Sequence, residues 1–267
     1  MNEGFEPNVV TEYERDTWSR CADSYLDTFA GITQETVPLL IEAGDIQRGS
    51  KVLDIGSGPG NVAGQLSKDG ANVTGVDFSS MMVEVAKKSY PHITFQQADA
   101  EELPFEADIF DTVVANYVVH HLARPERVFA EVFRVLKPGG RFAFAVWGPP
   151  EEQSSIGAFF SAVEAHHDVA ALPHGPLFGI TSRDVYEPML AKAGMEIRQL
   201  AVHETTWRTD SLDPVLRGFW TWGNMASLPP ETQAKIEETT RENARQYEQD
   251  GRFVFPHSAL VCSAVKP

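Results

Sequence analysis

A glycine-rich turn directly follows a short apolar stretch, and this is the part of the sequence best suited to binding chemistry. Residues 52–60 read VLDIGSGPG, an apolar run typical of a buried parallel strand, with the acid Asp54 inside it. Gly56, Gly58 and Gly60 follow in quick succession. Residues without a Cβ atom allow a tight turn and let a ligand lie directly on the backbone. The stretch therefore predicts a site for a nucleotide-like ligand, with a purely structural turn as the alternative.

The spacing of these glycines separates the turn from two common phosphate-binding loops. The dinucleotide fingerprint is G-x-G-x-x-G after a strand, whereas here the third glycine comes one residue early. A P-loop ends in Gly-Lys-Ser/Thr, and residues 59–61 are Pro-Gly-Asn. An NAD-dependent oxidoreductase nevertheless stays open as an alternative, because an acid after the second strand serves both kinds of nucleotide cofactor.

Polar side chains stand at the ends of the next predicted strands. Asp77 follows the β-branched run 71–76, about 20 residues beyond the glycines, where an acid accepts hydrogen bonds from ribose hydroxyls. Asp99 and Glu101 follow the third strand, and Asn116 ends the fourth. Ligands bind at the carboxyl ends of parallel strands, so we expect these side chains to converge beside the glycine turn.

Each of these residues also has a structural interpretation when taken alone. Asp77 is a candidate helix cap, Asp99 a candidate exposed loop residue, and Asn116 a candidate strand cap. Three such residues at three successive strand ends favour a binding site instead. Phe78 and Met82 then lie where they can sandwich an adenine.

Strand and helix patterns alternate after residue 50, which predicts an α/β fold with a doubly wound, mostly parallel sheet. The early elements expected are strands 52–55, 71–76, 93–97, 110–117 and 141–147, and helices 61–68, 81–89 (capped by Ser79 or Ser80) and 125–136. The later ones are helices 154–167, 182–193, one from 213 and 230–249, a loop over 172–180, and strands 195–207 and 252–266. The two late strands predict a hairpin on the sheet edge. The expected division is an N-terminal helical segment (1–45), a cofactor-binding core (46–150), and lid helices with the last two strands (151–267).

Composition excludes several classes of partner. The net charge of −16, from 38 acidic against 22 basic residues, argues against nucleic acid and against anionic membrane surfaces. Cys21 and Cys262 are far apart and form no C-x-x-C pair, so neither a metal site nor a disulfide is predicted. Glu3 and Glu6 replace the basic start of a signal peptide, and no apolar run approaches the length of a membrane span. We expect a cytoplasmic protein with a small-molecule partner, either a monomer or a homodimer.

Five motifs taken together resemble a known family. VLDIGSGPG, VTGVDFS, QQADAEELPF, NYVVHHL and RVLKPGGRF are similar to the class I S-adenosylmethionine-dependent methyltransferases, especially the small-molecule branch with the ubiquinone/menaquinone methyltransferases. The resemblance covers roughly residues 18–147. It implies a Rossmann-like sheet of seven strands with the last strand inserted antiparallel, S-adenosylmethionine as cofactor and S-adenosylhomocysteine as product.

The resemblance also implies a role for each matching position. The turn residues Gly56, Ser57, Gly58 and Gly60 would line the methionine and ribose part of the cofactor, after Asp54 in the strand. Asp77 would bind the ribose, Phe78 and Met82 would flank the adenine, and Asp99, Ala100 and Glu101 would lie at its edge. Asn116 and Val118 would follow the methionyl side, and Tyr25 matches a tyrosine that closes over the cofactor.

Methyl transfer from a sulfonium needs a base only where the acceptor must lose a proton. His121 follows the fourth strand, and a histidine titrates in the range a general base requires. Cofactor contact or packing is the alternative role for it. Aromatic residues are dense from residue 147 onward and predict an apolar lid over a ring-containing or lipid-like acceptor, with ordinary core packing as the alternative: Trp147, Phe159, Phe160, Trp207, Phe219, Trp220 and Trp222. A non-catalytic S-adenosylmethionine-binding protein is the third functional class.

Overall fold

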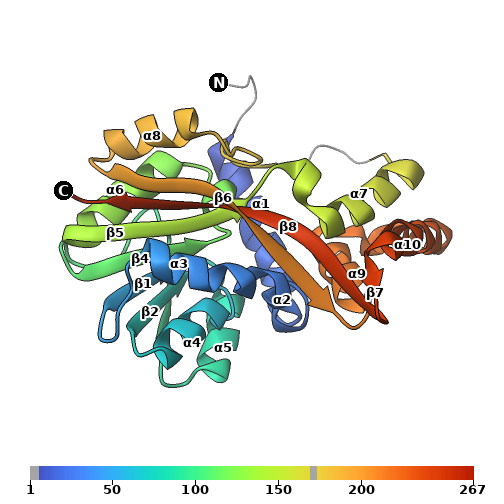
Figure 1. Cartoon of the computed structure of the whole chain (residues 1–267), viewed down its shortest axis with the longest axis horizontal. Coiled ribbons are helices and arrows are strands. Elements are labelled where there is room, and N and C mark those ends of the chain that lie inside the picture. The colour runs from blue at the N-terminus through green and yellow to red at the C-terminus, as the bar shows by residue number, and fades with distance from the viewer. Residues whose placement is uncertain (1–5, 169–172) are drawn as a thin grey trace.

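The computed structural model describes residues 6–168 and 173–267. It is built on one twisted sheet flanked by helices (Figure 1). The strands in chain order are β1 (Lys51–Ile55), β2 (Asn72–Asp77), β3 (Thr94–Gln97), β4 (Phe110–Asn116), β5 (Leu136–Trp147), β6 (Glu196–Thr209), β7 (Glu248–Gln249) and β8 (Arg252–Val265). The helices are α1 (Pro7–Cys21), α2 (Ala30–Thr33), α3 (Val37–Ala43), α4 (Asn61–Lys68), α5 (Ser80–Ser89), α6 (Pro125–Val135), α7 (Ser154–His166), α8 (Arg183–Lys192), α9 (Asp213–Trp222) and α10 (Pro230–Ala244).

The strand order is β3-β2-β1-β4-β5-β8-β6, with the short β7 paired to β8. Strands β1 to β5 pair in parallel, while β8 runs antiparallel between β5 and β6. This confirms the doubly wound, mostly parallel sheet and the inserted last strand. The two late strands pair antiparallel at this end of the sheet, as expected, with β6 on the edge and β8 between β6 and β5. Strand β8 is continuously buried over residues 257–264, as a central strand must be.

Helices cover both faces of the sheet (Figure 1). On one face, α6 and α8 pack on the strands through residues such as Phe129, Val132 and Tyr186. On the other face, α3 and α4 contribute Leu40 and Leu66 to a second core beneath β1, β4 and β5. Side chains of this kind each stabilise the fold by about 1.5–3 kcal/mol when fully buried. The two cores fix the sheet, and the sheet in turn fixes the strand ends.

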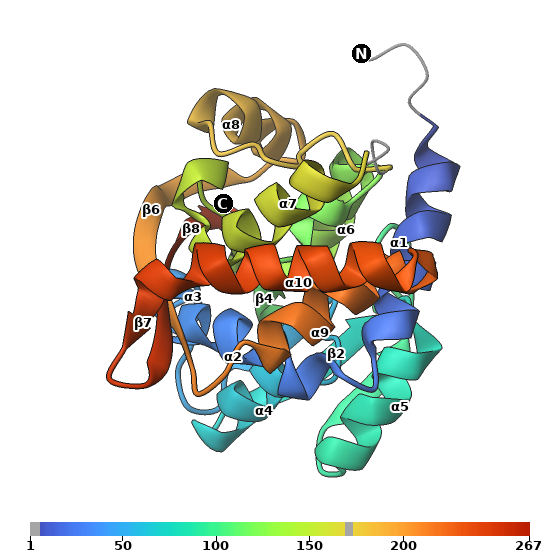
Figure 2. The same cartoon turned by 90° about the vertical axis from the view of Figure 1, so that its right-hand side faces the viewer.

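The long strands β6 and β8 extend beyond the parallel part of the sheet. Their far ends carry α7, α9 and α10, as the side view in Figure 2 shows. Trp207 pairs with Phe255 across this extension, and both are buried in a third core with Phe159 and Phe219. This third core also takes in the N-terminal helix, because α1 packs against α9 and α5. The extension therefore holds the N-terminal segment beside the carboxyl ends of the strands.

Most predicted elements are confirmed within one to three residues, and two departures have a local cause. Helix α10 ends at Ala244 instead of running to 249, because Asp250 and Gly251 adopt positive φ and form a hairpin between β7 and β8. Strand β5 begins at Leu136, five residues before the predicted start, with a register shift opposite β4 between its Leu136 and Arg141 pairings. Of the predicted loop over 172–180, Leu172 lies outside the described residues, as do residues 1–5 of the predicted N-terminal segment.

A buried polar network ties β8 to the start of α7. His257 Nε2 lies 3.0 Å from Ser155 Oγ, and its Nδ1 lies 3.0 Å from Gln153 Oε1. Gln153 Nε2 donates to the carbonyl of Ser258 at 2.9 Å. Burial lowers the pKa of His257 to about 4. The imidazole is therefore neutral at pH 7, where it joins the two elements without a buried charge.

Acid should weaken this network. The pKa of His257 is about 4 in the folded state against an ordinary 6.5, so the unfolded state binds the proton more tightly and stability falls as pH drops from 6.5 to 4. The loss is about 3 kcal/mol. We therefore expect His257→Gln to be less stable than the parent at pH 7 and nearly equal to it at pH 4, measured by urea unfolding. His92→Gln, at an exposed position, is the control, and a His257→Gln deficit that stays constant with pH would contradict this account.

Within residues 6–168 and 173–267, none of the helices combines the length and the apolar character needed to cross a bilayer.

Candidate functional site

The glycine turn needs residues without a side chain. Gly56, Gly58 and Gly60 have φ of +63°, +52° and +88°, a region that other residues rarely adopt. A Cβ atom on Gly56 would lie 2.4 Å from Cγ2 of Val118, the second residue after β4, so the turn packs closely against that segment. Gly60 is the N-cap residue of α4, the helix predicted over 61–68, so the first free N–H groups of that helix lie next to the turn. The sequence therefore brings a bare backbone surface to the ends of β1 and β4.

Asp77 joins the end of β2 to this turn. Its two carboxylate oxygens accept hydrogen bonds from the backbone N–H of Gly58 at 2.9 Å and of Ser79 at 2.8 Å. The side chain is buried, and burial raises its pKa to about 6. Each carboxylate oxygen accepts more than one hydrogen bond, so Asp77 keeps capacity for further hydroxyl donors. Ser79 also caps α5, as predicted, by accepting from the N–H of Met82.

Asp54 is the most deeply buried acidic side chain of the site. It is 1% exposed, and its Oδ2 has no hydrogen-bond partner among the described residues. Burial and then the neighbouring Asp77 raise the pKa of Asp54 to about 8, against the lowering effect of the Ala63 N–H. The Ser57 hydroxyl, also buried, is likewise without a partner there. Orphaned polar atoms of this kind are uncommon in folded proteins and indicate a ligand that supplies the missing donors.

Removing this charge should stabilise the protein when no ligand is bound. The folded-state pKa of Asp54 is raised from 3.8 to about 8, so stability is greatest below pH 4 and declines as pH rises towards 8. We expect Asp54→Asn to raise the free energy of unfolding at pH 8 by on the order of 3 kcal/mol, with little change at pH 4. Chemical denaturation at both pH values measures it. A variant no more stable than the parent at pH 8 would contradict the burial of an uncompensated carboxylate.

The residues predicted to lie beside the adenine differ in how deeply they are buried. Met82 is buried, and its sulfur lies 4.0 Å from the Cβ position of Gly58, while Phe78 is half-buried and stacks under the Arg15 guanidinium. Asp99 is exposed, and its carboxylate accepts from the N–H of Glu101.

The acidic residue Glu101, two positions after Asp99, takes part in ion pairs. The Glu101 carboxylate pairs with Arg124 and Arg127 at 3.3 and 3.5 Å, and Ala100 packs on the sheet core. The Asp99 side chain is exposed and takes no part in these ion pairs, so it can still bind a ligand. The Glu101 side chain is already paired with two arginines.

The Asn116 side chain makes two hydrogen bonds to the N-terminal segment that the sequence does not predict. Its Nδ2 donates to the carbonyl of Thr33 at 2.8 Å, and its Oδ1 accepts from Thr36 Oγ1 at 2.7 Å. Only the backbone of Asn116 is therefore free to face a ligand. The chain then turns sharply, since Tyr117 has a φ of +57°, and this brings Val118 against Gly56.

Helix α1 and the residues after it contact the segments that follow β2 and β4. Tyr25 lies in a short 3-10 turn, η1 (Tyr25–Asp27), and donates to Thr33 Oγ1 at 3.4 Å. Burial raises the pKa of Tyr25 to about 12, and the charges that reach it include Asp77 and Asp54. Ser19 of α1 hydrogen-bonds Ser79 at 2.9 Å, which anchors α1 over the end of β2.

Two histidines follow β4 in a second 3-10 turn, η3 (Val119–His121). His121 Nδ1 lies 2.9 Å from Oε1 of Glu14 on α1, and its ring contacts Trp18 edge to face. Sequence reasoning missed Glu14, which is 3% exposed and also accepts from Trp18 Nε1 at 3.0 Å. The only feature of the local sequence that pointed to Glu14 is its spacing of one helical turn from Trp18, which places the two side chains next to each other on a helix.

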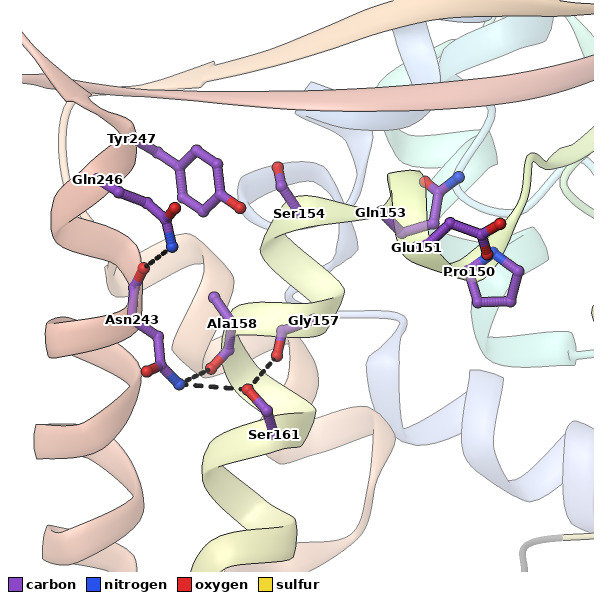
Figure 3. Close-up of a pocket in the computed structure, with 10 residues that line it drawn as sticks. All are labelled: Pro150, Glu151, Gln153, Ser154, Gly157, Ala158, Ser161, Asn243, Gln246 and Tyr247. Atoms are coloured by element: carbon purple, nitrogen blue, oxygen red, sulfur yellow. Dashed lines mark hydrogen bonds between the residues drawn. The ribbon is translucent and has the colours of Figure 1, made fainter.

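The aromatic residues that were predicted to form a lid pack mainly against one another in a core. Trp147, Phe159, Phe160, Trp207, Phe219, Trp220 and Trp222 belong to the third core, which also contains Trp18 and Tyr25. A nearby cavity of about 290 Å³ lies between α7 and α10 (Figure 3). Its lining residues come from the segments 150–161 and 243–247 and include no residue of the glycine turn, so this cavity is separate from that turn.

The residues present fit the cofactor that the resemblance implies. Bare backbone at Gly56 and Gly58 leaves room for a ligand, and Asp77 offers acceptors for adjacent hydroxyls. The unpaired carboxylate of Asp54 suits a ligand that carries positive charge.

Comparisons with known proteins agree with this geometry. Residues 53–144 match the model of a family described as a methyltransferase domain. The chain is 30% identical over 231 residues to the methyltransferase GfsG of Streptomyces halstedii, covering 77% of this chain and 80% of that protein. It is 36% identical over 140 residues to an uncharacterized methyltransferase, YcgJ, of Bacillus subtilis. The solved structure of YcgJ aligns with a TM-score of 0.56 at 22% identity, over 87% of this chain and 98% of that one, which shows a shared fold.

The quinone-pathway relatives are similar over a shorter region. The ubiquinone/menaquinone biosynthesis C-methyltransferase UbiE of Desulfotalea psychrophila is 40% identical over 116 residues, 42% of this chain and 47% of that protein. The chain spans about half the length of the first curated relatives it matches, 55% and 47%.

Proposed function

Since the chain belongs to the S-adenosylmethionine-dependent methyltransferase family, we propose that it transfers a methyl group from S-adenosylmethionine to a small acceptor. The observation that carries the proposal is the glycine turn with its orphaned Asp54 carboxylate and Ser57 hydroxyl, next to the strand-end acid Asp77. A ligand bound at the turn would supply the hydrogen-bond donors that these buried atoms lack.

The cofactor would lie across the ends of β1, β2 and β4. Gly56, Ser57, Gly58 and Gly60 would face its methionine and ribose part, and Asp77 would accept from the ribose hydroxyls. Phe78, Met82, Asp99 and Ala100 would surround the adenine, with Glu101 behind them. Asp54, the Asn116 backbone and Val118 would follow the methionyl side, and Tyr25 would close over it.

The chain's own residues mainly position and enclose the reactants. When bound, the cofactor supplies an activated methyl group, and its displacement requires the acceptor atom to be in line with the methyl carbon. Helix α1 shields the site from water through Ser19 and Glu14. His121, the candidate base, lies in η3 after β4 and would take a proton from an acceptor that must lose one.

The proposed division has three parts: the N-terminal segment (1–45), the core (46–150) and the lid helices with the last two strands (151–267). The third part would hold the acceptor. The aromatic side chains gathered there suit an apolar or ring-containing molecule. We also place the reaction in the cytoplasm, since Cys21 and Cys262 are both free and buried, which fits a reducing compartment.

The direct test is methyl transfer. The purified protein is incubated with methyl-labelled S-adenosylmethionine and candidate quinone precursors and phenols, and S-adenosylhomocysteine is quantified with and without each acceptor. The proposal expects acceptor-dependent S-adenosylhomocysteine. Tight cofactor binding without turnover on any acceptor would instead support the non-catalytic alternative.

A further inference from the structure

A second group of orphaned polar atoms lies beyond the cofactor residues, at the end of β4. Both ring nitrogens of His120 are buried without hydrogen-bond partners among the described residues, and the Tyr117 hydroxyl, buried beside the Thr36 side chain, makes no hydrogen bond of good geometry there. The His120 ring lies 4.1 Å from the His121 ring and 6.4 Å from that of Tyr117, between centroids. Trp147 packs 4.2 Å from Tyr117, so these polar atoms sit in an aromatic setting.

Glu14 determines which nitrogen of His121 carries a proton. Its two oxygens accept from Trp18 Nε1 at 3.0 Å and face His121 Nδ1 at 2.9 Å. A carboxylate only accepts, so Nδ1 bears the hydrogen and the neutral imidazole keeps its lone pair on Nε2. Nε2 has no hydrogen-bond partner among the described residues, and the His121 side chain is 12% exposed.

We propose that Glu14 is a positioning residue that presents His121 Nε2 as the proton acceptor for a neutral, hydroxyl-bearing ring compound, whose oxygens His120 and Tyr117 bind. The inference rests on the proposed methyltransferase function and identifies the acceptor class of the same site. In the step, the acceptor O–H gives its proton to His121 Nε2, and the oxygen lone pair forms the bond to the methyl carbon. The carbon–sulfur bond breaks with its electron pair going to sulfur, and the imidazolium later releases its proton to water.

Charge and polarity at the cluster favour a neutral acceptor. Burial lowers the pKa of His120 well below its ordinary value, so its ring offers one donor and one acceptor and no positive charge. The charged group hydrogen-bonded to His121 is the Glu14 carboxylate, which repels an anion such as a phosphate or carboxylate. A hydroxyl on a ring supplies the missing donor and acceptor, and its ring can contact Trp147 or Phe178.

Glu14→Gln is a sharp probe, because it changes the tautomer with almost no change in shape. Trp18 Nε1 only donates, so the single amide oxygen of the glutamine must face it. The amide NH₂ then faces His121 Nδ1, which must become an acceptor and move its hydrogen to Nε2. The matched control is Glu12→Gln, which removes the same charge from the exposed side of α1.

The first measurement is the tautomer itself. Long-range proton–nitrogen NMR of the full-length protein at pH 8, with His121→Gln used for assignment, should show hydrogen on Nδ1 in the parent and in Glu12→Gln. In Glu14→Gln it should appear on Nε2. A parent protein with the hydrogen on Nε2, or a Glu14→Gln spectrum like that of the parent, would overturn the positioning role.

The second measurement uses 4-nitrophenol as a ring-hydroxyl probe, added at pH 6 to protein saturated with S-adenosylhomocysteine. The parent should bind it with the yellow absorbance of the ionised phenol, because His121 takes its proton. Glu14→Gln and His121→Gln should reduce this absorbance by about tenfold or more while still binding S-adenosylhomocysteine, and Glu12→Gln should retain it.

The possible outcomes distinguish the acceptor class and the role of Glu14 from the proposed methyltransferase function. Failure of the parent to bind 4-nitrophenol overturns the acceptor class, and ionisation that persists in Glu14→Gln overturns the role of Glu14. Failure to bind S-adenosylhomocysteine in the first place contradicts the proposed methyltransferase function instead.

Discussion

Asp77→Asn should lower the affinity for S-adenosylmethionine by about two orders of magnitude. The carboxylate would accept from two adjacent ribose hydroxyls, and hydrogen bonds to a charged group contribute about 1.5–3 kcal/mol each. Asparagine keeps only one oxygen, and its NH₂ would point at the N–H of Gly58 or Ser79, where two donors repel. Isothermal titration calorimetry of the parent and the variant measures the difference.

The control for this variant is Asp69→Asn. Asp69 follows α4, is exposed, and accepts only from Gln65 Nε2, so the same chemical change there should leave the affinity unaltered. The thermal midpoint of ligand-free Asp77→Asn should stay within a few degrees of the parent, because the substitution also removes a buried charge. Unchanged cofactor affinity in Asp77→Asn would remove the ribose assignment.

Gly56→Ala should have the largest effect on both folding and binding. The added Cβ would lie 2.4 Å from Val118 Cγ2, and the φ of +63° disfavours any residue with a side chain by about 1–2 kcal/mol. The turn must shift away from the ends of β1 and β4. We expect a loss of stability of about 3 kcal/mol in urea unfolding and no measurable cofactor binding.

Two further variants separate the clash from the strain. Gly58→Ala has a similar φ of +52°, but its Cβ would meet only Met82 Sδ at 4.0 Å, so it should cost only the conformational part, about 1–2 kcal/mol. Val118→Ala combined with Gly56→Ala should recover part of the lost stability, because it removes the atoms in conflict. Equal destabilisation by Gly56→Ala and Gly58→Ala would show that the contact with Val118 does not matter.

The structural features around the glycine turn that the sequence predicts correctly all come from local patterns. An apolar run followed by glycines fixes the turn, and the fall in hydrophobicity at Asp77 marks the end of a strand. The cap at Ser79 and the start of α4 follow from the same short-range rules. These features need only a few neighbouring residues to form.

The features that the sequence did not predict depend on contacts between distant segments. Glu14 meets His121 across 107 positions, and Asn116 is held by Thr33 and Thr36 some 80 positions away. No periodicity signals such pairs. The interior place of β8, which the resemblance implied, also has a local signal, because residues 259–265 (ALVCSAV) are apolar except for Ser263, as expected of a strand covered on both faces.

The account depends most directly on the ligand that the glycine turn accepts. Calorimetric titration of the purified protein with S-adenosylmethionine, S-adenosylhomocysteine and NADH decides it. We predict micromolar binding of both adenosyl compounds, weakened strongly by Asp77→Asn, and no binding of NADH. Binding of NADH without the adenosyl compounds would contradict the account and favour an oxidoreductase on the same fold.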